Sequence, residues 1–486
     1  MGPINKSRFW AAAVWGEAVE LEYQAPPGCE DEPIIEINEI SHLYANPPAS
    51  ILRQGKPSKQ DGVIRMTVLP CQEDVNCHSV DPVARDSVGC MQFTDNGSTY
   101  WCAGALLADA DPNTFAGYFL TANHCLSTQQ AVDSLTVYWL YQTESCNGPF
   151  PPLEQQPKSL GGTLLAASPA SDFTFIRLAD DPNDGQGFAA WTTADASGTL
   201  TGIHHPGQGT FKRVAFGALT GEPPVCAGYS TSNYWYLDWT TGVTEGGSSG
   251  SPLFNTSWQV VGQLFGACLV PGKTVGCDNP EDYNILYGKF GATYPSIAGW
   301  LTQVIPDDAY EDNDSLEQAA PISRGSHNLK LLDFEDIFLI NSPQSGQITV
   351  TATYNPADFQ PLLQLVHPNG TSIAQSGTWS GTETVTSSQP PGSYKIRMLK
   401  QRKWGGNYTL NITLPPAYSD FDMDGDVDMV DFGHLQRCYS GSGPQADPAC
   451  FDACLDGDNR VNAADLAVFN ACYSGPNVPA GAGCKP

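Results

Sequence analysis

Basic residues are scarce in this sequence. The 486 residues include 23 Lys and Arg against 52 Asp and Glu, which gives a formal net charge of -29. Proteins that bind nucleic acid need clustered positive charge to neutralise the phosphates, so this composition argues against a nucleic-acid partner. Charged residues make up only 15% of the chain, whereas Gly and Pro number 48 and 38. We therefore expect a mainly β protein of short strands joined by many turns.

Long apolar runs and paired zinc-type cysteines are also missing. No stretch approaches the ~18 consecutive apolar residues of a transmembrane helix, and no CxxC pair has zinc-like spacing. The 15 cysteines therefore predict disulfides and a secreted or cell-surface protein. Their odd number leaves at least one thiol unpaired within the chain. The N-terminal sequence MGPINKSRFWAAAVWGEAVELEY makes a poor signal peptide, so we expect the secretion signal to be missing from this chain.

Length and local pattern divide the chain into four regions, because a single core holds no more than ~250 to 300 residues. Residues 1–65 are interpreted as a truncated pro-region and linker, and 66–304 contain closely spaced strand-like segments such as FTFIRL and QVVGQLFG. Period-two alternation and a PNG turn in 307–415 predict a small antiparallel β-sandwich. Residues 416–486 contain an internal repeat, in which a shift of 34 residues superposes CYSG at 438 on CYSG at 472.

Three segments of the first strand-rich region carry the residue types of serine catalysis. His124 follows an apolar segment in YFLTANHC, Asp172 precedes another in SDFTFIRL, and TEGGSSGSPLF offers Ser248, Ser249 and Ser251. A serine nucleophile needs a base, a carboxylate that orients the base, and N–H donors for the oxyanion. Each segment alone is more commonly a turn or a surface histidine. The chain order His, Asp, Ser in β-rich surroundings is that of the chymotrypsin-like double barrel.

Eight segments between about residues 71 and 266 resemble the secreted bacterial lysyl endopeptidases, a branch of the chymotrypsin-like serine proteases. In chain order they are LPCQEDVNC, CAGALL, TANHC, VYWLYQTESC, SDFTFIRL, GIHHPG, GVTEGGSSGSPLF and VVGQLFG. The resemblance implies protein or peptide substrates and no cofactor for catalysis. It implies His124 as general base, Asp172 as its orienting carboxylate, Ser249 as nucleophile, and Gly247 and Ser249 as oxyanion donors.

The same resemblance implies disulfides and a simple mode of activation. The implied pairs are Cys102–Cys125, Cys77–Cys146, and one from Cys71 to either Cys268 or Cys277. Ser248 precedes the nucleophile, where zymogen-activated digestive proteases carry an Asp that pairs with a newly cut N-terminal ammonium. We therefore expect no ion-pair switch of that kind.

The predicted substrate pocket departs from the family. Lysyl endopeptidases hold the lysine ammonium with an Asp just before a Tyr-Gly-basic-aromatic stretch. Here YGKF is preserved at 287–290, but the nearest carboxylate, Asp282, is a few residues out of register. Phe265 replaces the pocket-wall His of the family, and Val243 lies six residues before Ser249, where trypsin-type enzymes keep an Asp. A basic P1 preference and an altered or apolar pocket are both open.

The segment DFDMDGDVDMVD has the spacing of a calcium-binding loop. Gly425 occupies position 6, where the loop turns sharply, and the predicted ligands are Asp420, Asp422, Asp424, Asp426, Asp428 and Asp431. In the repeat, Cys454 takes position 1 and the predicted ligands are Asp456, Asp458, Asn462 and Asp465. A thiol is a poor calcium ligand. The second loop should therefore bind more weakly, or Cys454 is in a disulfide and water fills its place.

Paired loops with Asp at position 12, each followed by one helix, resemble type I dockerins. This implies a small α-helical calcium-binding domain and a cohesin-like partner; a calcium-stabilised C-terminal cap is the alternative. Residues 307–415 resemble the β-sandwich that follows many secreted bacterial peptidases, through YEDNDS, DFEDIFLI and GSYKIRM. Asp312, Asp314 and Asp336 of that region fit turns as well as they fit calcium.

A secreted modular serine endopeptidase is the function expected for the whole chain. The alternative from another class is a calcium-dependent adhesion or scaffold protein with an inactive protease-like domain. The intact set of His124, Asp172 and Ser249 argues against that alternative.

Overall fold

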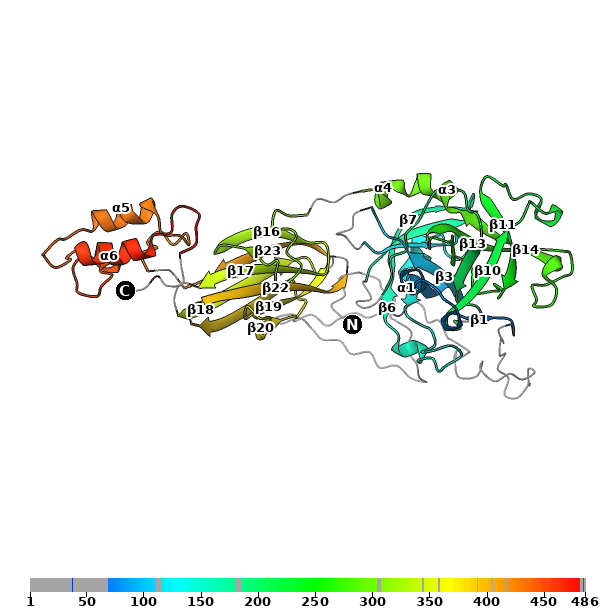
Figure 1. The fold of residues 1–486 in the computed structure, drawn as a ribbon, viewed down its shortest axis with the longest axis horizontal. Coiled ribbons are helices and arrows are strands. Elements are labelled where there is room, and N and C mark those ends of the chain that lie inside the picture. The colour runs from blue at the N-terminus through cyan, green and yellow to red at the C-terminus, as the bar shows by residue number, and fades with distance from the viewer. Residues whose placement is uncertain are drawn as a thin grey trace. The chain divides into compact units, whose positions relative to one another are not determined.

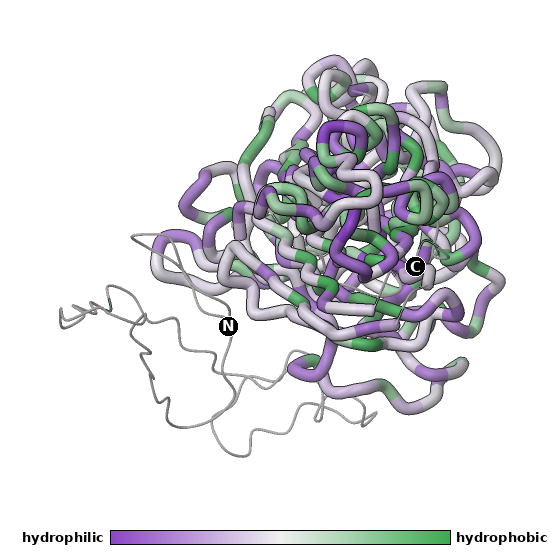
Figure 2. The backbone as a smooth tube through the Cα atoms, turned by 90° about the vertical axis from the view of Figure 1, so that its left-hand side faces the viewer, coloured by the Kyte–Doolittle hydropathy of each residue, from purple (hydrophilic) through white to green (hydrophobic). Residues whose placement is uncertain are grey.

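The computed structural model of the protein describes residues 37, 69–110, 116–180, 186–207, 209–303, 307–342, 345–356, 359–390, 392–403, 405–415, 418–480 and 484. They belong to two compact units, one within Lys6–Val304 and the other within Ile305–Pro486. Both units are rich in strands, as the composition predicts (Figure 1). Hydrophilic and hydrophobic residues alternate closely along the chain (Figure 2). Among the described residues no helix is long and apolar enough to cross a membrane.

The first unit begins with an antiparallel sheet of seven strands in the order β6-β5-β2-β3-β4-β8-β7. The two outer strands, β6 and β7, are not paired with each other within the described ranges, so this sheet forms a half-barrel. The strands are β2 Val88–Asp95, β3 Ser98–Leu106, β4 Tyr118–Thr121, β5 Thr136–Tyr138, β6 Lys158–Leu160, β7 Gly162–Ser168 and β8 Phe173–Leu178.

The second sheet closes into a barrel because β10 pairs with both β9 and β11. Its strands are β1 Glu73–Asp74, β9 Leu200–His204, β10 Arg213–Leu219, β11 Tyr234–Thr241, β12 Pro252–Phe254, β13 Val260–Leu269 and β14 Tyr283–Lys289. Leu237, Leu253 and Ile285 contribute to its buried core. We expected two closed barrels. The structure has one closed barrel and one half-barrel, so the expectation holds for one of the two sheets.

Short helices lie between these strands or follow β14. They are η1 Val75–Cys77, α1 Pro82–Asp86, α2 Gln129–Asp133, η2 Leu153–Gln155, η3 Pro224–Cys226, η4 Pro280–Asp282, α3 Phe290–Thr293, η5 Tyr294–Ser296 and α4 Ala298–Leu301. Asp81 and Thr128 start α1 and α2 by accepting hydrogen bonds from the N–H groups of Ala84 and Ala131, as N-cap residues do.

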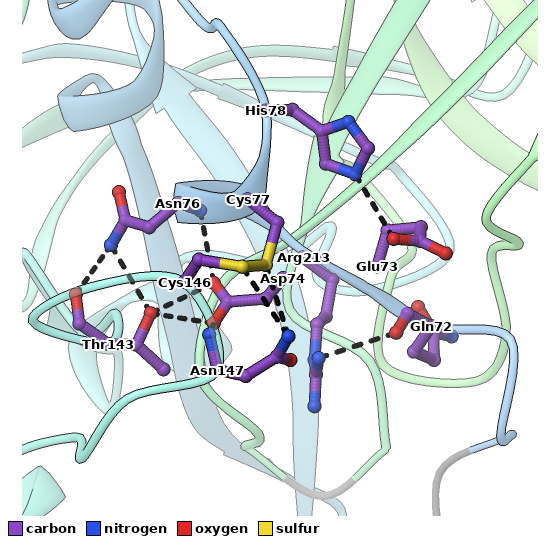
Figure 3. Close-up of a disulfide and its surroundings, with 10 residues drawn as sticks. All are labelled: Gln72, Glu73, Asp74, Asn76, Cys77, His78, Thr143, Cys146, Asn147 and Arg213. Carbon is purple, nitrogen blue, oxygen red and sulfur yellow. Dashed lines mark hydrogen bonds and ion pairs between the residues drawn. A yellow bond between two sulfur atoms is a disulfide. The ribbon is translucent and has the colours of Figure 1, made fainter.

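Four disulfides lie in the first unit: Cys71–Cys277, Cys77–Cys146, Cys102–Cys125 and Cys226–Cys268. Cys71 thus pairs with Cys277, because Cys268 is taken by Cys226. Figure 3 shows Cys77–Cys146 beside Asp74, whose carboxylate accepts hydrogen bonds from Thr143 Oγ1 at 2.8 Å and Asn147 N at 2.8 Å. Cys90 is buried and unpaired, and Cys29 lies outside the described residues.

The second unit contains a β-sandwich with one shared core. One sheet has the order β15-β17-β22-β19-β20 and the other β16-β23-β18-β21. Ile348, Val350 and Ala352 of β18 alternate with threonines and point into the core, as the period-two pattern predicts. The strands are β15 Ala320–Pro321, β16 Gly325–Leu331, β17 Glu335–Ser342, β18 Gly346–Tyr354, β19 Phe359–Val366, β20 Ser372–Ser376, β21 Thr382–Gln389, β22 Gly392–Lys403 and β23 Gly406–Thr413.

The C-terminal part of this unit consists of α5 Met429–Arg437, η6 Pro448–Ala453 and α6 Ala463–Cys472 around a separate small core. The two repeats contact each other reciprocally. Ser440 Oγ accepts a hydrogen bond from Val461 N at 2.9 Å, and Ser474 Oγ accepts one from Val427 N at 3.0 Å. These serines are the third residues of the two CYSG segments, so the contact accounts for that part of the repeat. Two disulfides, Cys438–Cys450 and Cys472–Cys484, close the helix ends.

Candidate functional site

His124 and Asp172 meet at one end of the half-barrel. The strands β4 and β8 pair antiparallel, with Thr121 opposite Thr174. His124, three residues after β4, and Asp172, the residue before β8, therefore lie at the same end of this strand pair. His124 Nδ1 is 2.7 Å from Asp172 Oδ2, and His124 N donates to Asp172 Oδ1 at 2.9 Å. Asp172 is 4% exposed, so both of its oxygens are used on one partner and the orientation of the imidazole is fixed.

The closed barrel supports the turn that carries Asp172. Gln263 Nε2, on β13, donates to the carbonyl of Ser171 at 2.7 Å. A Cβ added to Gly288 of β14 would lie 1.9 Å from that same carbonyl oxygen. Asp172 itself has a φ of 55°, a left-handed conformation that needs support from its surroundings. Contacts between the two sheets thus set the position of the carboxylate.

Ser249 reaches the same region through its main chain. Its carbonyl accepts a hydrogen bond from Ala103 N at 2.8 Å, and the Ala103 carbonyl accepts one from Thr121 Oγ1 at 2.8 Å, three residues before His124. Gly250 packs against Thr121 so closely that an added Cβ would lie 2.2 Å from Thr121 Oγ1. No hydrogen bond joins Ser249 Oγ to His124 within the described ranges. Such contacts are often long before substrate binds.

Exposure separates the three serines of the loop. Ser248 and Ser251 are fully buried, whereas Ser249 is partly exposed. Ser248 Oγ lies 2.8 Å from Nδ1 of the buried His204. Ser249 is therefore the one serine of the three with access to a substrate, and the Ser248 hydroxyl is bonded to His204.

Several main-chain N–H groups of this loop, those of Gly247 and Ser249 among them, have no acceptor among the described residues. Ser248 N, Gly250 N and Ser251 N donate to the carbonyls of Glu245, Leu264 and Ser248. Within the described part of the chain, Gly247 N and Ser249 N have no acceptor. Gly247 has a φ of 92°, and an added Cβ would lie 2.1 Å from the Gly207 carbonyl oxygen. Only glycine fits there, and the loop leaves two donors beside Ser249.

The predicted pocket residues have different surroundings. Val243 is buried in the core of the closed barrel with Leu264 and Tyr287. Asp282 accepts hydrogen bonds from Asn279 Nδ2 at 2.8 Å and Lys273 Nζ at 3.1 Å, and these two contacts lower its pKa. The Phe265 ring packs edge-on to His124, with 5.7 Å between ring centroids.

Sequence reasoning missed two aromatic neighbours of Phe265. Tyr229 and Tyr234 lie with their ring centroids 5.0 Å and 5.6 Å from that of Phe265. Burial raises the pKa of Tyr234 to about 12. Their spacing in the sequence gave no signal, because Tyr234 on β11 and Tyr229 in the turn before it reach Phe265 on β13 only in the folded barrel.

Residues 68–283 match the family model described as lysyl endopeptidase, C-terminal domain. A curated lysyl endopeptidase from Pseudomonas aeruginosa is 25% identical over 309 residues, which cover 60% of this chain and 63% of that protein. The chain therefore spans less than two thirds of the length of this relative.

Two proteases are among the solved structures that are similar to this chain. The active form of a protease from Mycobacterium tuberculosis is 16% identical, covers 51% of this chain and 97% of its own, and has a TM-score of 0.30. The protease Anisep from Arthrobacter nicotinovorans is 17% identical, covers 47% and 99%, and has a TM-score of 0.31.

The predicted ligands of the first calcium loop converge on Asp431. This residue is fully buried, and carboxylate oxygens of Asp420, Asp422 and Asp431 lie within 4.8 Å of one another, as do those of Asp426, Asp428 and Asp431. Asp431 also accepts hydrogen bonds from the N–H groups of Phe421 at 2.6 Å and Asp428 at 2.9 Å. Asp424 is in neither group; its Oδ1 accepts a hydrogen bond from Asp426 N at 3.1 Å.

Two buried carboxylate oxygens of this loop are left without hydrogen bonds. Asp420 Oδ2 pairs with Arg324 Nη1 at 2.9 Å, but among the described residues neither Asp420 Oδ1 nor Asp426 Oδ1 has a hydrogen-bond partner. Burial raises the pKa of Asp420 to about 6. Unpaired buried oxygens surrounded by carboxylates fit a hard cation such as calcium.

The second loop has the same arrangement around a buried Asp, here Asp465, but fewer carboxylates. Asp456, Asp458 and Asp465 lie within 4.8 Å of one another, and Asp465 accepts from the N–H groups of Leu455 and Asn462 at 2.6 and 2.8 Å. Asn462 Oδ1 caps α6 by accepting from Ala464 N. Cys454 is a free thiol, so the disulfide alternative for that residue is wrong.

Proposed function

We propose that residues 69–303 form a serine endopeptidase that hydrolyses peptide bonds through an acyl-enzyme. The observation that carries the proposal is the Asp172–His124 contact together with Ser249, the accessible serine of the loop, whose main-chain N–H and that of Gly247 have no acceptor among the described residues. The match of residues 68–283 to the lysyl endopeptidase model supports it.

Each residue of the site has its own role in the reaction. Ser249 Oγ attacks the substrate carbonyl while His124 Nε2 takes its proton, because Asp172 accepts the hydrogen bond from Nδ1 and so holds the required tautomer. The N–H groups of Gly247 and Ser249 stabilise the oxyanion. His124 then protonates the leaving amine, and a water molecule activated by the same imidazole releases the acyl group from Ser249.

For substrate choice we propose an uncharged P1 side chain. Val243 is apolar and buried at the position of a trypsin-type Asp, and the Asp282 carboxylate is already paired with Lys273. The aromatic group of Phe265, Tyr229 and Tyr234 lies next to His124. Basic P1 preference, the property in the name of the relative, is the competing proposal.

The test uses labelling as well as turnover. A fluorophosphonate probe should modify the wild-type chain at Ser249, and Ser249→Ala should abolish both labelling and hydrolysis of a peptide panel with Lys, Arg, Glu, Phe and Leu at P1. The matched control is Ser251→Ala, which should keep labelling at Ser249. Labelling without hydrolysis of any peptide would favour the adhesion or scaffold alternative, and absence of both in the wild type would refute the protease.

For the C-terminal module we propose calcium in the first loop, held by Asp420, Asp422, Asp426, Asp428 and Asp431, and a weaker site in the second. A bound calcium would neutralise the carboxylates that otherwise repel one another. A cohesin-like partner is supported by apolar side chains that stay exposed on this module, among them Met429, Val430, Tyr439 and Tyr473. Calorimetry of a cohesin domain with the chain, in calcium and in chelator, tests the partner directly.

A further inference from the structure

Glu245 connects the loop of Ser249 to the turn that begins at Leu69. It lies four residues before Ser249 and is half-buried. Its Oε1 accepts hydrogen bonds from the main-chain N–H of Leu69 at 3.1 Å and from Gln72 Nε2 at 2.9 Å. These two partners are 176 and 173 residues away in the sequence, so the contact exists only in the folded unit.

The turn that carries Leu69 and Gln72 is held by contacts of its own. Gln72 N donates to the Leu69 carbonyl at 3.2 Å and closes the turn. Arg213 Nη1, on β10, donates to the Gln72 carbonyl at 3.4 Å (Figure 3). The disulfide Cys71–Cys277 attaches the same turn to the connection between β13 and β14, and the next segment, β1, pairs with β10. Glu245 therefore contacts a turn whose position is fixed by the closed barrel.

The main chain of Glu245 is bonded to the residue before the nucleophile. Ser248 N donates to the Glu245 carbonyl at 3.0 Å, and Glu245 N donates to Ser248 Oγ at 3.3 Å. The carbonyl of Gly246, the next residue, accepts a hydrogen bond at 2.7 Å from the loop after β9. A displacement of Glu245 would therefore move both residues that flank Gly247, one of the two proposed oxyanion donors. Ser248 also directly precedes Ser249.

The surroundings of Glu245 suit a hydrogen-bond acceptor, whether charged or neutral. Its two side-chain donors are a main-chain N–H and an amide, and both are uncharged. Burial raises the pKa of Glu245, while the bonds from Leu69 and Gln72 and the charge of Arg213 act in the opposite direction. An uncharged amide oxygen at the same place could accept both hydrogen bonds. The contact therefore supplies position more than charge.

We propose that Glu245 is a positioning residue for peptide hydrolysis, which holds the loop of Gly247 and Ser249 against the turn at Leu69 and Gln72. This inference rests on the protease proposed above. Donors that are already in place stabilise a developing oxyanion better than donors that must first be ordered. Loosening the contact should therefore slow the chemical step and leave binding of the peptide nearly unchanged. Glu245 acts through the loop, without contact with the substrate.

The experiment measures steady-state kinetics of the full chain and the rate of fluorophosphonate labelling at Ser249. Glu245→Ala removes both side-chain bonds, and we expect kcat and the labelling rate to fall about tenfold with KM nearly unchanged. Glu245→Gln keeps an oxygen acceptor and should retain most of the wild-type rate. The matched control Glu222→Ala changes an exposed residue of the same unit and should behave as the wild type. A normal kcat in Glu245→Ala would overturn the proposal.

Substitution of Gln72 tests the same contact from the other side. Gln72→Ala removes one of the two bonds and leaves the carboxylate in place, so kcat should fall about threefold. Added to Glu245→Ala, it should cause no further loss, because both residues act through one contact. Fully additive losses would contradict that shared contact. If Glu245→Ala does not fold, Gln72→Ala decides the question, and an unchanged kcat there would overturn the proposal.

The P1 panel separates positioning from a direct contact with the substrate. If Glu245 positions the loop, Glu245→Ala lowers kcat by the same factor for every peptide that the wild type cleaves. A loss confined to peptides with Lys or Arg at P1 would overturn the proposal and place Glu245 in the pocket. A lower melting temperature with an unchanged kcat would show a purely structural role. A wild type that neither hydrolyses nor labels would refute the protease and this role together, whereas an active wild type with unaffected variants refutes this role alone.

Discussion

Asp172 and Asp336 are both almost fully buried carboxylates, but their surroundings are opposite. Both oxygens of Asp172 contact donors of His124, at 2.7 and 2.9 Å. Asp336 has one donor, Tyr408, and its nearest charges are other carboxylates. A buried charge is stable when it is paired and costly when it is not. The protein alone therefore satisfies both oxygens of Asp172, whereas among the described residues one oxygen of Asp336 has no partner.

The two units extend this contrast. In the half-barrel and closed barrel, Asp74 and Asp172 each receive several donors from the protein. In the second unit, Asp336, Asp420 and Asp426 each keep a buried oxygen without a partner. We therefore expect metal removal to affect the second unit and leave the first unit folded.

The largest effect should come from a change at Asp172, the buried carboxylate with both oxygens paired. Asp172→Asn keeps the size of the side chain but cannot hold the required tautomer of His124, so kcat should fall about 10⁴-fold. Steady-state kinetics on the best peptide of the P1 panel measures this. Asp133→Asn, an exposed change on α2, is the matched control and should keep kcat within about twofold. Equal losses in both variants would contradict the assignment.

Calcium removal tests the second unit, which contains the buried carboxylate oxygens without partners. At a calcium concentration of 100 times Kd, binding contributes about 2.7 kcal/mol to the stability of the folded form. Scanning calorimetry of Ser249→Ala, which prevents autolysis, should show two transitions. Chelator should lower the transition of the second unit by several degrees and leave that of the first unit in place. A shift of the first transition alone would show that the contrast is wrong.

Acid should destabilise the first unit because it contains the buried histidines His204 and His205. Burial, followed by the charge of Arg213, lowers the pKa of His204 to about 3; burial, followed by the charge of Lys212, lowers that of His205 to about 3. Between pH 6.5 and 3 the unfolded state binds these protons and the folded state does not. Stability therefore falls as the pH falls, by about 2 kcal/mol for each histidine at pH 5.

Urea unfolding of Ser249→Ala at pH 7 and pH 5 measures this loss. His204→Gln should reduce it, since one of the two titrating groups is gone. If the loss at pH 5 were the same in both proteins, His204 would not be the buried group that titrates.

The smallest expected effect is a fall in kcat on substitution of His204, which we interpret as a positioning residue. His204→Phe removes the 2.8 Å partner of the buried Ser248 hydroxyl, which then keeps only the hydrogen bond that its oxygen accepts from Glu245 N at 3.3 Å, and so disturbs the loop that carries Gly247 and Ser249. A buried hydroxyl whose O–H has lost its acceptor costs about 1 to 3 kcal/mol, and we expect about a tenfold fall in kcat with little change in KM. His204→Gln can still bond to Ser248 and should restore most of the rate. A purely structural role would lower stability in His204→Phe but leave kcat unchanged.

The sequence was sufficient where chemistry depends on local spacing. The Asp positions in Asp420–Asp431 predicted a loop, and the structure brings most of those carboxylates around Asp431. The alternation in β18 predicted which residues face the sandwich core. Likewise, the apolar segments before His124 and after Asp172 are the paired strands β4 and β8. In each case, residues close in the chain determine the outcome through strand or loop geometry.

Tertiary structure decided what depends on distant segments. The partner of Cys71 is Cys277 only because β13 and η3 bring Cys268 to Cys226. Ser249 is distinguished from Ser248 and Ser251 by burial, and the N–H groups of Gly247 and Ser249 by the bonds of their neighbours. The carboxylates of Glu311, Asp314 and Asp333 come together from segments that have β15 and β16 between them. Burial and pairing are properties of packed segments, so spacing along the chain does not determine them.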